Sequence, residues 1–99
     1  MIKKRRYLLE LYITGTRSRS TQAIQNIKAL CDRFLPDSYT LEVIDIYQQP
    51  EHARKAQIVA APTLIKRRPL PQRKFIGDMS KSQQLIDGLD LKPHVPPSE

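Results

Sequence analysis

The 99-residue chain has one cysteine, three glycines and no long apolar run, and each of these scarcities excludes a class of protein. A single thiol, Cys31, can form neither an internal disulfide nor a structural zinc site. Three glycines leave no glycine-rich loop for binding phosphate. The apolar runs are only a few residues long, which is too short for a transmembrane helix. The length allows one domain with one modest core.

Acidic residues are also scarce, with 10 against 17 basic residues and a net charge of +7. This balance indicates an acidic partner, which could be nucleic acid, an anionic membrane or a protein surface. The basic start of the chain is similar to the first part of a signal peptide. However, Glu10 interrupts the apolar residues that follow, and no cleavage-site pattern comes after them. We therefore expect a strand over residues 7–13 and a cytoplasmic protein.

The first half of the chain predicts a strand, a helix and a second strand. Residues 7–13 alternate, and both faces are largely apolar, as in a central strand. A helix follows that Ser18 or Ser20 can cap and that Pro36 ends. Its apolar stripe consists of Ile24, Ile27, Leu30 and Phe34. Residues 41–46 predict the second strand.

The second half predicts shorter elements. Pro50 suits the first turn of a short helix, and Ala61-Pro62 precedes a strand over residues 63–66. Prolines 69 and 71 then turn the chain into a strand over residues 73–76, which we expect to pair with residues 63–66 as a hairpin. Ser80 and Gln83 form a capping-box pattern before a last helix. That helix is expected to bury Leu85, Ile86 and Leu89.

The predicted order is therefore β-α-β-α-β-β-α, in one α/β domain over residues 1–91. This is the thioredoxin arrangement, in which a cis proline characteristically precedes the third strand, as Pro62 does here. Residues 92–99 contain three prolines and no pattern, so we expect a disordered tail.

The sequence lacks the redox chemistry of that fold. A thioredoxin-like enzyme needs a cysteine at the start of its first helix, where the helix dipole stabilises a thiolate. Here that turn is Gly15-Thr16-Arg17-Ser18, and Cys31 lies about three turns further on. We interpret Cys31 as a small core residue and expect Cys31→Ser to be nearly neutral. The two histidines are far apart, so we expect no enzyme, cofactor or metal, and a redox enzyme remains a remote alternative.

Six short segments resemble the KaiB family, in order and with matching spacing over residues 7–91. They are residues 9–15 (LELYITG), 43–46 (VIDI), 61–64 (APTL), 69–71 (PLP), 76–80 (IGDMS) and 88–91 (GLDL). The resemblance implies a protein that binds a KaiC-type ATPase as a thioredoxin-like monomer. It also implies an oligomeric ground state, a tetramer or a dimer, which keeps β-α-β in residues 7–46 and rearranges the second half. A KaiA-like protein or a sensor kinase is a further implied partner, and the implied role is circadian timing or stress adaptation.

The resemblance implies that a few residues take part in the change of fold: Tyr7, Pro62, Pro71, Gly88 and Asp90. X-Pro isomers differ by only about 0.5–1 kcal/mol in free chains, which makes two packings feasible. Glycine in a helix costs about 1 kcal/mol relative to alanine. We therefore hypothesise that Gly88→Ala favours the thioredoxin-like state. We also expect the unbound chain to adopt the ground state, with residues after Pro50 departing from the thioredoxin order.

Residues 66–74 (KRRPLPQRK) carry five positive charges and no negative charge. One interpretation is a solvated hairpin. Another is a patch that steers an acidic surface of the ATPase, with Lys66, Arg73 and Lys74 at positions that match basic residues of the family. A third is direct binding of nucleic acid, although aromatic residues do not interleave with the basic ones to stack on bases.

Overall fold

The computed structural model describes residues 6–15 and 17–91, so the predicted disordered tail lies outside the described residues. The element order confirms the sequence prediction. The elements are β1 (Tyr7–Ile13), α1 (Ser18–Phe34), β2 (Tyr39–Asp45), α2 (Pro50–Lys55), β3 (Thr63–Arg68), β4 (Arg73–Ile76) and α3 (Ser82–Gly88). None of the helices in this part of the chain has the length and apolar character needed to cross a membrane.

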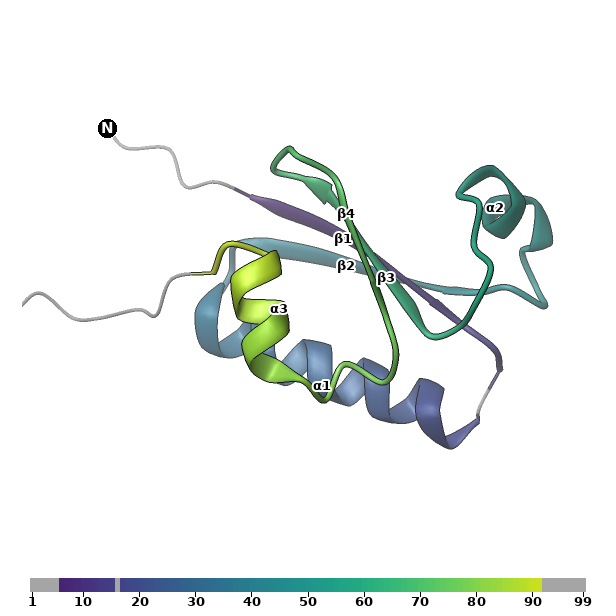
Figure 1. Ribbon diagram of the computed structural model, residues 1–99, viewed down its shortest axis with the longest axis horizontal. Helices are drawn as coiled ribbons and strands as arrows, with labels where there is room; N and C mark the ends of the chain where they lie inside the picture. Colours follow the sequence, from purple (N-terminus) through teal and green to yellow (C-terminus); the bar gives the residue numbers. More distant parts are fainter. Residues whose placement is uncertain (1–5, 16, 92–99) are drawn as a thin grey trace, which may run out of the picture.

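The four strands form one sheet in the order β2-β1-β3-β4, with β1 and β3 in the centre (Figure 1). Strands β1 and β2 are parallel, β3 runs antiparallel to β1, and β4 pairs with β3 as a hairpin. This is the thioredoxin-like α/β arrangement that the sequence predicted. It leaves β2 and β4 as the two edges of the sheet.

The second half does not show the rearrangement that we expected for an unbound chain. Residues 63–66 pair with residues 73–76, and the Ala61-Pro62 peptide bond before β3 is cis. The strand pairing belongs to the thioredoxin-like arrangement, so this structure shows that state, and the oligomeric ground state stays a prediction.

Helices α1 and α3 lie on the same side of the sheet and build the larger core (Figure 1). The alternating residues of β1 that were predicted to share a face all point into this core. From α1 the predicted stripe contributes Ile27 and Leu30, which are buried, while Ile24 and Phe34 pack at the margin. Leu85 and Leu89 close the core from the side of α3, as predicted, whereas Ile86, which was also predicted to be buried, is only partly buried at its margin.

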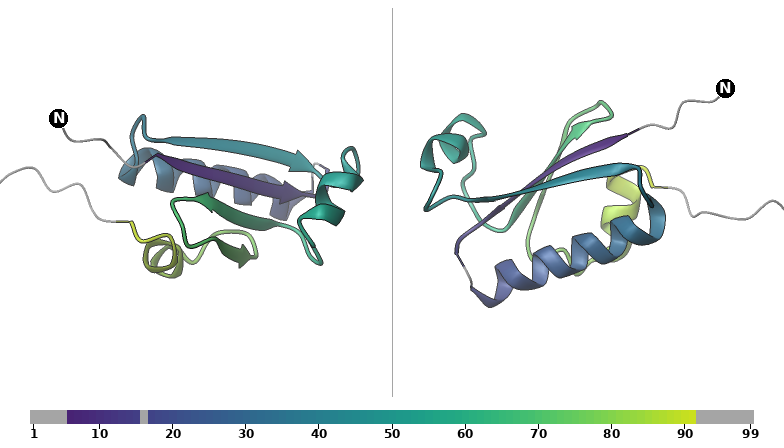
Figure 2. Two further views of the ribbon diagram at one scale, coloured as in Figure 1. Left: turned by 90° about the horizontal axis from the view of Figure 1, so that it is seen from above. Right: turned by 180° about the vertical axis from the view of Figure 1, so that it is seen from behind.

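On the opposite face of the sheet, the only helix of the described residues is α2, which lies at one end of the molecule in both views of Figure 2. Ala53 of α2 packs against a small cluster of Tyr12, Ile44 and Ile65. Because α2 has six residues, it covers only part of this face, and Leu8 at the other end of β1 is 40% exposed.

Neither predicted helix cap forms. The residue before α1 is Arg17, which makes no side-chain cap, and Ser20 is buried, where its hydroxyl accepts a hydrogen bond from the Thr14 amide at 3.2 Å. Helix α3 begins at Ser82 instead of directly after Ser80. The Ser80 amide donates to Asp78 Oδ1 at 3.0 Å, so a tight turn replaces the capping box.

Candidate functional site

The only thiol of the chain is buried and favours its protonated form over the reactive thiolate. Cys31 belongs to α1 and is fully buried in the core with the other apolar residues of that helix. Burial raises the pKa of its thiol to about 12, and the nearby Asp32 carboxylate acts in the same direction. Its full burial also corrects one expectation: serine would bring a hydroxyl into an apolar site at a cost of about 1–3 kcal/mol. With this burial in view, we expect Cys31→Ser to lower the stability of the fold.

A hydrogen bond from Tyr7 joins the two ends of the domain. Tyr7 begins β1 and is only 4% exposed. Its hydroxyl lies 2.9 Å from the carbonyl oxygen of Leu89 and 3.2 Å from that of Asp90, just beyond α3. The phenol thus links the start of β1 to two carbonyl groups that follow α3.

Other residues with a predicted role in the fold change gather beside this bond. A cavity of about 200 Å³ is lined by Lys66, Pro71, Arg73, Gly88 and Asp90, together with Leu70 and Asp87. Asp90 itself has a φ of +58°, a left-handed conformation that aspartate tolerates better than most residues. The structure therefore brings together Tyr7, Pro71, Gly88 and Asp90 around the C-terminal end of α3.

The position of Gly88 bears on the hypothesis that alanine there favours this fold, which stays a prediction. Gly88 is the last residue of α3 and lies against the ring of Phe75 in β4. A Cβ atom at this position would lie 2.6 Å from Phe75 Cζ and closer still to Cε2. Because the ring would have to move, we expect the crowding to oppose the gain in helix propensity.

Pro62 and Lys74 lie away from this cluster. Pro62 directly precedes β3 at its other end, where its carbonyl accepts a hydrogen bond from the Gly77 amide at 3.0 Å. The Lys74 ammonium donates to the carbonyl oxygens of Ala56 at 3.0 Å and Gln57 at 3.4 Å, just after α2. These bonds connect the end of α2 to the β3–β4 hairpin. The sequence did not predict this internal role for Lys74.

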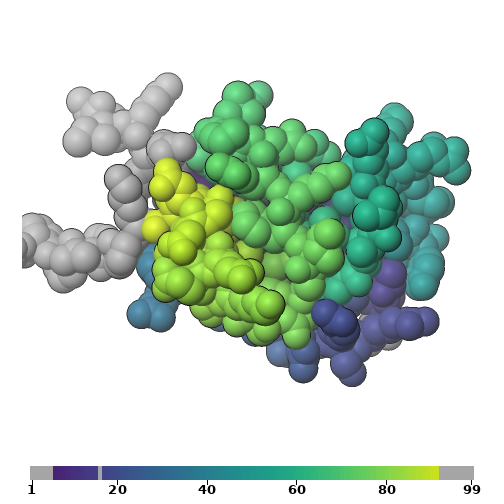
Figure 3. Space-filling model, in the orientation of Figure 1, coloured from purple at the N-terminus to yellow at the C-terminus, as the bar shows by residue number. Residues whose placement is uncertain are grey.

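The basic stretch does not form one continuous patch, because successive strand residues point to opposite faces. Lys66 shares the face of α3 and is only 2% exposed, whereas Lys74 points toward α2. Arg68 and Arg73 are exposed at the hairpin, which lies beside α3 on the face shown in Figure 3. In this fold a partner can reach Arg73 directly but not the buried side chain of Lys66.

Sequence reasoning missed an ion pair on the α2 side of the sheet. Arg67 Nε donates to Glu10 Oε1 at 2.8 Å, and the Tyr12 hydroxyl donates to the same oxygen at 3.0 Å. The hydrogen bond to Glu10 raises the pKa of Arg67, and burial, followed by Glu10, raises the pKa of Tyr12. The alternation of side chains along β1 and β3 could have predicted this pair, since it places Glu10 and Arg67 on the same face of the sheet, away from α1.

Comparison with known families decides where the chain belongs. Residues 10–91 match the family described as the KaiB domain, which is most of the chain. The chain belongs to the KaiB family. No group of histidine, cysteine, aspartate or glutamate in the part that the structure describes could hold a metal ion.

Similar KaiB proteins cover nearly the whole chain. The circadian clock protein KaiB3 of Synechocystis is 47% identical over 88 residues, which is 89% of this chain and 86% of that protein. The circadian clock oscillator protein KaiB of Nostoc punctiforme is 40% identical over 92 residues, covering 92% and 88%. The sequence resemblance to KaiB is thereby confirmed.

Solved structures confirm the fold. The N-terminal domain of Synechococcus elongatus SasA superposes with a TM-score of 0.70 at 26% identity, covering 91% of this chain and 89% of that domain. Mitochondrial thioredoxin 3 of Saccharomyces cerevisiae gives a TM-score of 0.70 at 16% identity, covering 90% and 82%. The second likeness concerns the fold alone.

Proposed function

We propose that this KaiB protein has no catalytic activity and regulates a KaiC-type ATPase by binding to it, in circadian timing or in stress adaptation. The observation that carries the proposal is a thioredoxin-like frame without a thiolate: its one cysteine is buried and has a raised pKa. The names of the curated relatives, which are clock proteins, support a regulatory role. A cytoplasmic location belongs to this proposal, since an ATPase partner needs ATP.

The exposed cations of the hairpin support an electrostatic contribution to binding. Arg68 and Arg73 project from the turn between β3 and β4 and can attract an acidic surface. Such charges raise association rates and lose their effect as salt rises. The likeness to the SasA domain supports competition between the two proteins for one kind of partner surface. A KaiA-like protein or a sensor kinase remains a further proposed partner.

A change of fold is part of the same proposal. The ground state would be a homo-oligomer that keeps residues 7–46 and releases the second half. Support comes from the Tyr7 hydroxyl, which bonds to carbonyls just beyond α3 and therefore breaks its contacts if α3 moves. Oligomerisation would favour the ground state as protein concentration rises.

The test is binding of the full chain to the KaiC-type ATPase of the same organism, in the presence of ATP. We expect saturable binding that weakens between low and physiological salt, and that Arg73→Glu weakens further. Lys28→Glu is the matched control, because Lys28 is exposed on α1 and away from the hairpin. Random-sequence DNA at physiological salt should not bind. Absence of binding to the ATPase would mean that the proposed function is wrong.

A further inference from the structure

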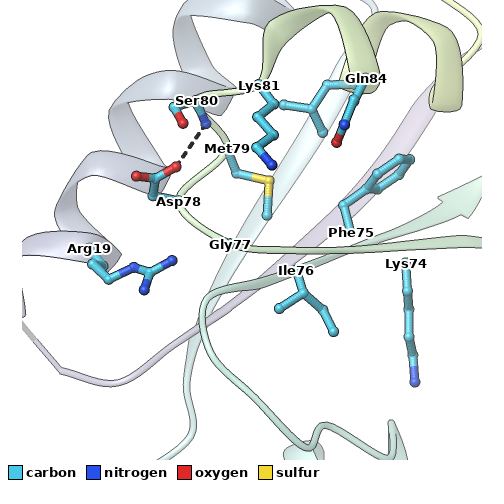
Figure 4. Close-up of a pocket in the computed structure, with 11 residues that line it drawn as sticks. Arg19, Lys74, Phe75, Ile76, Gly77, Asp78, Met79, Ser80, Lys81 and Gln84 are labelled. Atoms are coloured by element: carbon cyan, nitrogen blue, oxygen red, sulfur yellow. Dashed lines mark hydrogen bonds between the residues drawn. The ribbon is translucent and has the colours of Figure 1, made fainter.

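A second cavity, larger than the one lined by Gly88 and Asp90, lies along the open edge of the sheet. It is bounded by β4, by the loop over residues 77–81, by the start of α3 and by Arg19 near the start of α1 (Figure 4). Its volume is about 400 Å³, within the range of roughly 300–1,000 Å³ that is usual for ligand pockets. None of the residues named above for partner binding or fold change lines it, apart from Lys74.

The lining of this cavity is mostly positive. Arg19 and Lys81 contribute two cations, against the single carboxylate of Asp78, while the ammonium of Lys74, which also lines the cavity, is bonded to the carbonyls after α2. Figure 4 shows Lys81 pointing into the middle of the cavity and Arg19 at its side, whereas Lys74 points away. Asp78 is turned toward Ser80, whose hydrogen bonds lower the pKa of its carboxyl group, and Arg19 adds a smaller effect in the same direction. The positive charges of Arg19 and Lys81 therefore favour the binding of an anion in the cavity.

The same cavity has apolar walls and an open strand beside it. Phe75, Met79 and Leu85 line it along with the charged groups, and Met79 and Leu85 are buried in the core. Strand β4 is the last strand of the sheet, so the side of it that faces away from β3 has no neighbouring strand in the described chain. Such an edge accepts an extended peptide through backbone hydrogen bonds.

We propose that the cavity beside β4 binds an extended acidic segment of the partner ATPase, which pairs with the open edge of β4 and places a carboxylate between Arg19 and Lys81. An extended peptide points alternate side chains to opposite sides, so every second side chain, the acidic ones, would face Arg19 and Lys81, and the side chains between them would point away from the cavity. The proposal rests on the proposed binding to the ATPase. It adds a second contact region to the one at Arg73.

The first experiment tests the cavity without the ATPase. The ¹⁵N-labelled full chain is titrated with a short capped peptide of alternating glutamate and valine, and amide chemical shifts are followed. We expect shifts concentrated at residues 73–81, and binding about tenfold weaker or more in Arg19→Glu and Lys81→Glu, since like charges then oppose the peptide. Lys28→Glu, on the same helix as Arg19, should bind like the wild type. A peptide of alternating lysine and valine should not bind.

Some outcomes would overturn the proposal. They are the absence of shifts with the acidic peptide, shifts spread evenly over the chain, or an equal loss of binding in Lys28→Glu. Arg19 and Lys81 are both exposed, so their replacement should leave the fold intact, and the spectra of the free variants check this directly.

The second experiment separates this proposal from the proposed function. Wild type, Arg19→Glu and Lys81→Glu are compared for binding to the ATPase itself. Weaker binding in both variants, with Lys28→Glu unchanged, supports the proposal. If the wild type and both variants bind equally well, the cavity proposal is wrong while the proposed function stands. If the wild type does not bind the ATPase, the proposed function is wrong, and an acidic segment of that ATPase is ruled out as the occupant.

Discussion

The two halves of this KaiB protein are built differently. The first half has a 17-residue helix packed across two parallel strands of seven residues each. The second half has helices of six and seven residues and a four-residue edge strand. Three of its non-glycine residues adopt positive φ: Gln57, Met79 and Asp90.

The second half also depends on single contacts that hold it to the rest of the molecule. Tyr7 holds the end of α3, and Asn26 of α1 donates to the carbonyl oxygen of Asp78 at 2.9 Å. Lys74 fastens α2. Strand β3 is anchored by its pairing with β1, and Leu85 and Leu89 of the second half lie in the main core. The comparison indicates that the first half sets the frame of the fold, whereas the short elements α2, β4 and α3 carry additional single bonds that can be removed one at a time.

The largest expected effect comes from the core of the first half. Ile27 is fully buried between α1 and the sheet, so Ile27→Ala should lower the free energy of unfolding by about 2–5 kcal/mol. Both halves should lose protection against hydrogen exchange together, because β3 of the second half pairs with β1 of the first half. Selective loss in the second half alone would contradict the comparison. Urea unfolding and native-state hydrogen exchange measure the two effects.

The next effect concerns the contact between Gly88 and Phe75. Gly88→Ala should cost about 1–2 kcal/mol in the thioredoxin-like state, because overpacking outweighs a helix gain of about 1 kcal/mol. In a Phe75→Leu background, which leaves space for the methyl group, the same change should be neutral or stabilising. A double-mutant cycle of unfolding free energies measures this coupling. Equal effects in both backgrounds would show that the ring does not limit position 88.

These contacts show what the sequence could and could not predict. Periodicity predicted the strands and α1, because a fully apolar face leaves little choice of register. The burial of Lys66 was hidden by its place among five basic residues, although alternation sets it on the same face as Leu64. Gly88 lies in α3 and Phe75 in β4, and the sequence pattern within one element does not predict a contact between two elements.

A smaller effect is expected from the Tyr7 hydroxyl. Tyr7→Phe keeps the buried ring and removes the donor to the carbonyls of Leu89 and Asp90, at a cost of about 0.5–1.5 kcal/mol. Amides of α3 should exchange faster, while those of β1 and β2 should not. Tyr39→Phe is the matched control, since its hydroxyl bonds to Asp32 within the first half. A uniform change over the whole chain would argue against a separately held second half.

The smallest effect is an alkaline loss of stability that comes from the first half. Burial raises the pKa of Cys31 from its ordinary value of 9.0 to about 12, so the thiol ionises first in the unfolded chain. Its contribution is complete below about pH 9 and is lost as the pH rises toward 12. By about pH 9.5 the loss should be under about 1 kcal/mol. Thermal unfolding at several pH values should show a shallower decline in Cys31→Ala, and parallel curves would contradict the burial of the thiol.

The most direct test of the account is hydrogen exchange of the full chain, free and in the presence of the proposed partner, a KaiC-type ATPase. The central claim is that the thioredoxin-like arrangement is the binding form and that its first half is common to all forms. We predict that amides of β1, α1 and β2 exchange alike in both samples, while those of β3, β4 and α3 become strongly protected on binding. Protection confined to the first half, or bound second-half amides that exchange as fast as in the free chain, would contradict the claim.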